Sequence, residues 1–292
     1  MLLLGLTVLI STATVRAADA VKDPKAIVAS HVASSESFFS GDAGFSVTNL
    51  YNSRGYALVT KGANFQPYAD FNFNVYQGDG FITSVTPTLG LWSNLTTNSN
   101  GTASATTDFE NWYEFDWMPG ISVVMAKRFN LSVAYFEFDS PSGGFKTARS
   151  INTTLAYDDA GLLDRSKNFS VQPCLTFLAE LPAPGSAGAL KNGEYLEPGI
   201  NPNYTFFQGS SYPLTVAVPI KLGFGNHFYT EGISFGYFSP GLAFSVPLAF
   251  MPSDCGSWTG SVGFKYFKTG DRVNAPEFRD QEIFNLSIGC KF

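Results

Sequence analysis

Histidine, which most often provides the general base of a hydrolase, is scarce in this chain of 292 residues. A Ser-His type of active site needs a histidine within hydrogen-bonding reach of a nucleophile. His31 precedes the first expected strand, and His227 follows Gly225 and Asn226 in a segment that favours a solvated loop. No phosphate-binding loop, zinc cluster or calcium loop of standard spacing occurs. We therefore expect no enzymatic activity, no metal site and no cofactor.

The three cysteines, Cys174, Cys255 and Cys290, fit neither a zinc spacing nor a small disulfide framework. A turn at Cys255 would bring the strand that follows it beside the strand that ends the chain. Two interpretations stay open at this point. Cys255 and Cys290 form a disulfide, or they are unpaired small apolar residues.

The beginning of the chain has the character of an export signal. Residues 1–20 contain an apolar run of about ten residues, followed by small residues that suit a signal-peptidase site. That run is too short to cross a bilayer as a helix. We expect residues 1–20 to be a signal peptide and residues 21–43 to be a periplasmic segment.

The composition indicates a surface that faces lipid as well as water. Charged residues make up 14 % of the chain and aromatic residues 15 %, whereas soluble domains carry about 25 % charged residues. Residues 232–253 lack charge but contain Pro240, Gly241 and Pro247, which favours a strand over a spanning helix. The net charge of −6 disfavours nucleic acid as a partner.

Alternation of apolar and polar residues is the strongest pattern in the sequence. In a membrane β-barrel alternate side chains face lipid and lumen, and a lipid-facing charge at the midplane costs about 2–4 kcal/mol. One parity carries no charge in each of five segments, 69–75, 85–91, 169–179, 214–222 and 284–292. A soluble β-sandwich also alternates, but it would normally have a more charged exterior. The pattern therefore predicts an all-β fold, a closed antiparallel transmembrane β-barrel with an up-and-down meander.

About twelve strands can be placed over residues 44–292, with short and long connections in alternation. Their expected spans are 44–54, 65–77, 81–94, 111–126, 130–140, 146–158, 168–181, 194–207, 212–224, 232–250, 257–268 and 281–292. Pro119-Gly120 and Pro240-Gly241 could each divide a strand, which leaves about ten or about fourteen strands as alternatives. An even number puts both ends of the barrel in the periplasm.

The last strand is expected to lie between the strands at 257–268 and 44–54. Its alternation directs Phe284, Leu286, Ile288, Cys290 and Phe292 toward lipid, and Asn285, Ser287 and Lys291 toward the lumen. The terminal Phe292 resembles the end of many bacterial outer-membrane barrels, in which an aromatic residue and its strand are read by the barrel-assembly machinery. This resemblance implies that Phe292 is an assembly signal.

Short motifs in the first half of the chain are similar to those of the TorF-like porin family of Gram-negative outer-membrane barrels. They are Tyr51-Asn52-Ser53-Arg54-Gly55, Gln66-Pro67-Tyr68, Gly90-Leu91-Trp92-Ser93-Asn94, and Glu114-Phe115-Asp116 followed by Pro119-Gly120. The family has an Arg-Gly pair after the first strand, a Gly-x-Trp stretch and an acidic strand in the same order. The long segment from Asn94 to Glu110 departs from this pattern. The resemblance implies an integral outer-membrane protein whose substrate is undefined.

Inward-facing positions would determine which solutes pass through such a barrel. The candidate pore-lining residues are Asp70, Asn72, Asn74, Glu114, Asp116, Gln172, Glu180, Glu197, Lys221 and Lys265. The acidic majority suggests a channel for small polar solutes with a mild preference for cations. The alternative is a non-conducting structural or ligand-binding barrel that displays its external loops. The solute and homo-oligomerisation stay open, and outer-membrane lipid is the expected surroundings.

Overall fold

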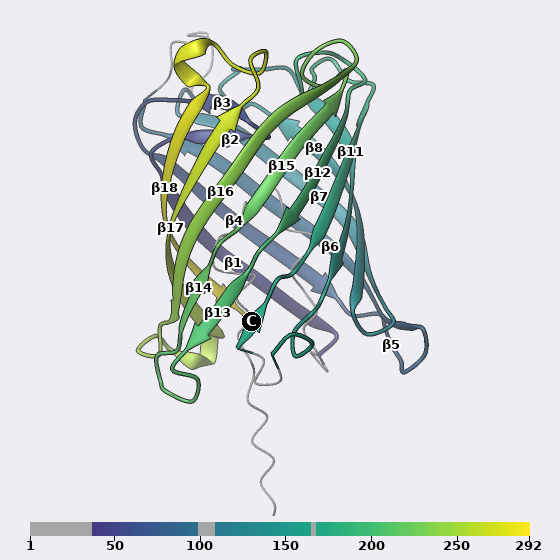
Figure 1. Ribbon diagram of the computed structural model, residues 1–292, viewed down its shortest axis with the longest axis vertical. Helices are drawn as coiled ribbons and strands as arrows, with labels where there is room; N and C mark the ends of the chain where they lie inside the picture. Colours follow the sequence, from purple (N-terminus) through teal and green to yellow (C-terminus); the bar gives the residue numbers. More distant parts are fainter. Residues whose placement is uncertain (1–36, 99–108, 165–167) are drawn as a thin grey trace, which may run out of the picture.

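The computed structural model describes residues 37–98, 109–164 and 168–292. The expected signal peptide and most of the expected periplasmic segment lie outside these described residues. The described chain forms a closed antiparallel barrel of 12 strands in which sequence neighbours pair (Figure 1). The prediction of a closed meandering barrel is confirmed. Across the described residues, no helix is long and apolar enough to cross a membrane.

The barrel strands follow the predicted spans closely. In chain order they are β1 (Phe39–Thr48), β4 (Asn64–Phe73) continued by β5 (Tyr76–Gln77), β6 (Ile82–Thr96), β7 (Trp112–Met125), β8 (Phe129–Asp139), β9 (Ala148–Tyr157), β10 (Phe169–Ser170) continued by β11 (Cys174–Leu181), β12 (Glu194–Ile200) continued by β13 (Asn203–Phe206), β14 (Leu214–Ala217) continued by β15 (Ile220–Asn226), β16 (Ile233–Pro247), β17 (Ser257–Thr269) and β18 (Asp280–Lys291). Three of the interruptions contain a proline, Pro173, Pro202 or Pro219, which lacks the N–H that a continuous ladder needs.

The ring closes where β18 pairs with β1 on one side and with β17 on the other, as expected for the last strand. Beyond the end of β18, Phe292 and Gly41 exchange two backbone hydrogen bonds of 2.8 and 3.0 Å. The Phe292 ring also contacts that of Phe39, with centroids 6.1 Å apart. We call this end of the barrel, which holds Phe39 and Phe292, the inner end, and the opposite end the outer end.

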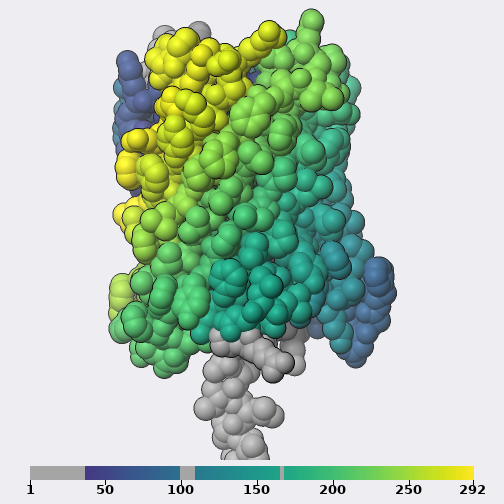
Figure 2. Space-filling model, viewed as in Figure 1, coloured from purple at the N-terminus to yellow at the C-terminus, as the bar shows by residue number. Residues whose placement is uncertain are grey.

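Alternation along the strands separates an apolar outer surface from a polar lumen. On β18, Phe284 and Leu286 are 56 % and 63 % exposed, whereas Gln281 on the opposite face is 2 % exposed. Neighbouring strands pack into a continuous wall in the view of Figure 2. Cys290 has the outward parity that was predicted but does not face lipid. It is 6 % exposed, because the turn that contains the short helix η3 (Ser253–Cys255) lies against it.

The first strand differs from its prediction. It begins at Phe39, within the expected periplasmic segment, and ends at Thr48 instead of continuing to residue 54. The reason is the side chain of Asn49, which accepts a hydrogen bond from the Phe284 amide at 2.8 Å and donates one to the Glu282 carbonyl at 3.0 Å. This side-chain amide replaces the next ladder pair with β18, so the backbone is free to leave the wall.

The two Pro-Gly pairs do not divide their strands. Pro119 and Gly120 both pair with β6, and the register with β8 resumes at Gly120 after a gap beyond Trp117. Pro240 pairs with Ile220 of β15, and the amide of Gly241 donates to the Pro219 carbonyl at 2.7 Å. Each proline costs local ladder bonds only, so the strand count stays at the predicted 12.

Candidate channel lumen

Residues 51–54, which were predicted as the end of the first wall strand, belong instead to a hairpin that projects into the outer half of the barrel. It consists of β2 (Tyr51–Ser53) and β3 (Tyr56–Val59), which form a separate sheet of two strands and lie at the end away from the C-terminus (Figure 1). The turn residues Arg54 and Gly55 have φ of 51° and 92°, the left-handed values of a tight hairpin turn. A Cβ on Gly55 would lie 2.9 Å from the ring of Tyr237 on β16, so the site favours glycine.

The first strand of the hairpin is fastened to the wall through Tyr51. Its ring is 3 % exposed and packs on Trp92 of β6 and Tyr113 of β7, with centroids 5.3 and 6.0 Å away. Its hydroxyl donates to Glu114 Oε2 at 2.8 Å. Tyr113 faces inward because the register of β6 and β7 shifts between Asn94 and Leu95. The bulge thus redirects an aromatic ring from the outer surface to the hairpin.

The tip of the hairpin crosses the lumen to the far wall. The guanidinium of Arg54 lies 5.3 Å from the ring centroid of Phe138 on β8 and 5.9 Å from that of Tyr195 on β12. These are cation–π distances. The Arg54 carbonyl accepts a hydrogen bond of 2.7 Å from Tyr229. Because β8 and β12 lie on the side of the ring away from β1, the hairpin spans the barrel interior.

Two side-chain amides hold the hairpin backbone. Asn274 donates to the Gly55 carbonyl at 2.7 Å and accepts from the Ala57 amide at 3.1 Å. Gln281 of β18 donates to the same carbonyl at 3.0 Å and accepts from the Asn52 side chain at 2.6 Å. These amides supply partners that a neighbouring strand would otherwise give.

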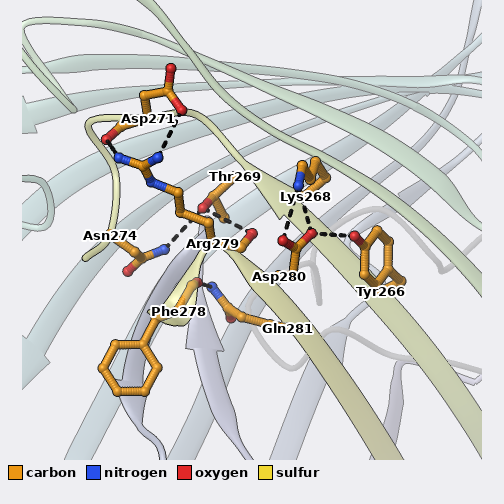
Figure 3. A network of polar contacts seen from close by, with 9 residues as sticks. All are labelled: Tyr266, Lys268, Thr269, Asp271, Asn274, Phe278, Arg279, Asp280 and Gln281. Atoms are coloured by element: carbon orange, nitrogen blue, oxygen red, sulfur yellow. Dashed lines mark hydrogen bonds and ion pairs between the residues drawn. The ribbon is translucent and has the colours of Figure 1, made fainter. Parts of the chain in front are cut away.

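Asn274 is positioned by the loop 270–279, which joins β17 to β18. In Figure 3 the Arg279 side chain turns back onto Asp271, with an ion pair of 3.1 Å and a hydrogen bond of 2.8 Å to the Asp271 carbonyl. The short helix η4 (Pro276–Phe278) completes the loop. The contacts between Arg279 and Asp271 therefore join the two ends of the loop, which fixes the direction of the Asn274 side chain.

Two other outer loops, 182–193 and 227–232, close over the hairpin. Glu180 at the end of β11 accepts hydrogen bonds from the Ser186 hydroxyl and the amides of Ala187, Gly188 and Gly193, at 2.5 to 3.0 Å. This fixes the loop 182–193. Tyr56 of the hairpin accepts from the Ala189 amide and donates to the Phe228 carbonyl, both at 3.1 Å.

Buried hydrophobic residues of the outer lumen, most of them aromatic, form two clusters, each of which includes or contacts residues of the hairpin. The first includes Tyr51, Trp92, Met118, Phe136 and Phe138, and the second includes Leu178, Tyr195, Phe228, Tyr229, Tyr237 and Phe267. Together with the hairpin they fill the outer half of the barrel. We call the hairpin and these clusters the outer plug.

The inward faces of the strands carry short polar side chains in the inner half of the barrel. They include Ser122, Asn130, Ser132, Thr154, Ser170, Asn203, Thr215, Ser245 and Ser261, all of them buried, and Ser287, which bonds to Ser261. Many of them bond across neighbouring strands, for example Ser122 with Asn130 at 2.7 Å and Thr154 with Thr176 at 3.0 Å. This surface suits water and small polar solutes.

The predicted pore-lining residues occupy different environments. Asp70, Asn72, Glu114 and Asp116 are buried on the inward faces of β4 and β7. Glu197 and Lys221 come together in an ion pair of 2.9 Å, and Glu197 also accepts hydrogen bonds from Tyr195 and Tyr237. Lys265 has the inward parity of β17. Their role in lining a pore stays a prediction.

Three predicted lining residues make contacts near the ends of the barrel. Glu180 anchors the loop 182–193, as described above. Asn74 donates to the Ser37 carbonyl at 2.8 Å at the inner end. Gln172 has a φ of 50° between β10 and β11, where its amide donates to Asp159 Oδ1 at 2.9 Å. Their role in lining a pore also stays a prediction.

The expectation that the chain has no Gly-x-Ser-x-Gly element was wrong, because residues 232–236 read Gly-Ile-Ser-Phe-Gly. Ser234 lies in the continuous strand β16 and its hydroxyl contacts the Gly225 carbonyl at 3.4 Å. A nucleophile elbow requires a sharp turn from strand to helix. His227 is exposed, with Nδ1 3.1 Å from Asn226 Oδ1. Within residues 37–98, 109–164 and 168–292, no three His, Cys, Asp or Glu side chains are grouped to hold a metal ion.

Burial keeps the tyrosines of the plug protonated. Desolvation raises the pKa of Tyr51 well above its usual value, and the nearby Glu114 adds to the effect. Burial likewise raises the pKa of Tyr56 and of Tyr229. All three hydroxyls therefore remain hydrogen-bond donors at neutral pH.

No protein-family model matches the sequence, and no curated protein matches it. The resemblance to TorF-like porins therefore stays a prediction. Similar solved structures include the NanC porin, with 10 % identity over 87 % of this chain and 100 % of that chain and a TM-score of 0.40. An outer membrane phospholipase A from Escherichia coli has 10 % identity over 85 % of this chain and 92 % of that chain, with a TM-score of 0.43. An outer membrane channel from Pseudomonas putida F1 has 10 % identity over 87 % and 95 %, with a TM-score of 0.42.

Proposed function

We propose that this protein is an outer-membrane channel for small polar solutes that is closed at rest by its outer plug. The observation that carries the proposal is the hairpin β2–β3 inside a barrel whose inner half is polar. The polar inner half of the lumen suits the diffusion of polar solutes, whereas the hairpin obstructs the outer half. Passage then depends on displacement of the hairpin.

The way in which the hairpin is held supports a movable plug. It forms a sheet of its own, and its contacts with the wall run through side chains such as Tyr51, Asn274 and Gln281. A hydrogen bond of this kind contributes about 0.5–1.5 kcal/mol net, and a two-stranded hairpin has little stability alone. Withdrawal of the hairpin would leave the barrel ladder intact.

Planar-bilayer recordings on the refolded protein test this function. The wild type is compared with a variant in which residues 50–60 are replaced by a Gly-Ser linker of equal length. We expect brief openings from the wild type and a steady conductance from the variant. If neither protein conducts although both insert, the protein is instead a non-conducting structural or ligand-binding barrel.

Ion selectivity is a finer part of the proposal. Acidic residues outnumber basic ones among the candidate lining residues: Asp70, Glu114 and Asp116 lie on the inward faces of β4 and β7, and Glu197 forms an ion pair with Lys221. This distribution supports a mild preference for cations through the opened barrel. The reversal potential of the linker variant in a KCl gradient measures it, and a value on the anion side would contradict it.

We further propose that the barrel is exported and inserted into the outer membrane of a Gram-negative bacterium, without enzymatic activity. Its largely apolar exterior suits lipid contact, and its last strand ends with Phe292 at the closing seam. The assembly machinery is the proposed partner of this strand. Deletion of Phe292 should reduce the heat-modifiable, folded fraction in outer-membrane preparations, and an unchanged fraction would contradict the role of Phe292.

A further inference from the structure

Cys255 and Cys290 lie together at the inner end of the barrel, and we propose that they are a site of disulfide formation. Both are thiols in the structure. The Cys290 sulfur donates to the Cys255 carbonyl oxygen at 3.2 Å. A Cβ built on Gly256 would lie 3.0 Å from the same sulfur. The Cys290 sulfur is therefore packed directly against the backbone that carries Cys255.

This arrangement is within reach of a covalent link. A disulfide requires Cα atoms about 4.4–6.8 Å apart, and contact of one sulfur with the carbonyl of the other cysteine places the two residues near that range. Cys255 ends the single-turn helix η3, and the next residue, Gly256, has a φ of 123°. Rotation of the exposed Cys255 side chain, with adjustment of this turn, brings the sulfurs together.

The third cysteine is excluded by the topology of the barrel. Cys174 lies on β11, where it pairs with Ala156 and Gly199. Strand β11 is on the side of the ring away from β18 and β1. Cys174 therefore provides an internal control, because its thiol should persist when the other two react.

The different exposures of the two cysteines set the order of the reaction. Cys255 is exposed, whereas Cys290 is 6 % exposed. The Cys255 thiolate attacks one sulfur of an external disulfide, such as oxidised glutathione or a protein oxidant, and releases the other sulfur as a thiolate. The deprotonated Cys290 then attacks the Cys255 sulfur and displaces the bound half. Overall the two cysteines lose two protons and two electrons, and the external disulfide becomes two thiols.

The link would fasten the turn 248–256 onto the strand that closes the barrel. Trp258 pairs with Cys290 in the β17–β18 ladder, and β18 also pairs with β1 at the seam. The disulfide closes a loop that contains the whole β17–β18 hairpin and the loop 270–279. It therefore restricts the unfolded chain most strongly around the seam.

Thiol counting on the folded barrel in detergent tests the proposal. The protein is incubated with oxidised glutathione, alkylated after denaturation and analysed by peptide mass spectrometry. We expect the wild type to keep one reactive thiol of its three cysteines, at Cys174, and to yield a Cys255–Cys290 linked peptide. Cys174→Ser should keep none. Cys290→Ser should retain glutathione on Cys255, which identifies the first attacking sulfur.

Two results would overturn the proposal. One is a wild-type barrel that keeps all of its thiols under these conditions, and the other is a linked peptide that contains Cys174. A second measurement uses the temperature at which the folded band is lost on unheated-sample gels. Oxidation should raise it by about 5–10 °C in the wild type and in Cys174→Ser, and not in Cys255→Ser. An equal shift in Cys255→Ser would also contradict the link.

Discussion

Tyr51 of the lumenal hairpin donates its hydroxyl to Glu114 of the barrel wall at 2.8 Å, although 63 positions separate the two residues in the chain. Both side chains are buried, at 3 % and 2 % exposure. A buried carboxylate costs free energy unless it is hydrogen-bonded. The docked hairpin thus supplies a donor that Glu114 loses when the hairpin leaves, which couples the wall to the plug.

Tyr51→Phe should therefore favour the open channel. The variant keeps the ring contacts with Trp92 and Tyr113 and removes one hydrogen bond to a carboxylate, at a cost of about 1–3 kcal/mol. We expect the open probability in planar bilayers to rise about 5- to 100-fold. Tyr135→Phe is the matched control, because Tyr135 bonds to Glu137 on the outer face. An equal rise in the control would rule out a specific effect of the plug.

Asn274→Ala should make the hairpin accessible while the barrel stays folded. The substitution removes the bonds to Gly55 and Ala57. The Gly55 carbonyl keeps its bond from Gln281, whereas the Ala57 amide loses the Asn274 oxygen that accepts from it. Amide hydrogen exchange of residues 51–59 should become about 10-fold faster or more, for a loss of about 1.5–3 kcal/mol. Glu277→Ala, in the same loop and exposed, should leave exchange unchanged. Identical exchange in the two variants would contradict the role of Asn274.

Alkaline pH should release the plug. Burial raises the pKa of Tyr51, Tyr56 and Tyr229 above the unfolded value of about 10. Their contribution to docking is complete below pH of about 10 and is lost as the pH rises toward the folded-state pKa. The acidic neighbours are Glu114, Asp116, Glu180 and Glu197, and Arg54 opposes the shift of Tyr229. Conductance should stay constant from pH 8 to about 10 and increase above pH of about 10, and less so in Tyr56→Phe. A flat profile in the wild type would contradict this mechanism.

Alternation was enough to predict the barrel and to place its strands, because a lipid-facing charge is costly at nearly every outward position. The prediction for the first strand, 44–54, failed beyond Thr48. There the alternation of β1 breaks, because Asn49 falls on its apolar parity and Leu50 on its polar parity. The informative signals were Asn49, which ends the ladder, and Arg54-Gly55, which forms a tight turn.

Predicting the plug would also have required contacts that no local sequence pattern contains. Asn274 and Gln281 bond to the hairpin from positions more than 200 residues away in the chain. Glu180 was predicted to line the lumen, and its bonds to the loop 182–193 are visible only in three dimensions. Parity gives the side of the wall on which a residue lies, and the partner on that side follows from how the loops fold.

The closing seam should be sensitive to volume at Gly44 and Gly289, which face each other across β1 and β18. A Cβ on Gly44 would overlap the Ile288 carbonyl and lie 2.8 Å from the Gly289 Cα, so the obstacle is backbone. A Cβ on Gly289 would instead lie 2.6 Å from the Tyr68 hydroxyl, the movable end of a side chain. Both sites are therefore crowded, but for different reasons.

Gly44→Ala should destabilise the folded barrel by about 1–3 kcal/mol in urea titrations, and Tyr68→Leu should not relieve the loss. Gly289→Ala should cost less, and Tyr68→Leu in the same chain should recover most of that loss, since it removes the group in the way. Gly80→Ala, where the nearest atom to a new Cβ is 3.9 Å away, is the neutral control. Rescue of Gly44→Ala by Tyr68→Leu would show that the side chain, and not the close approach of β1 and β18, limits the volume at the seam.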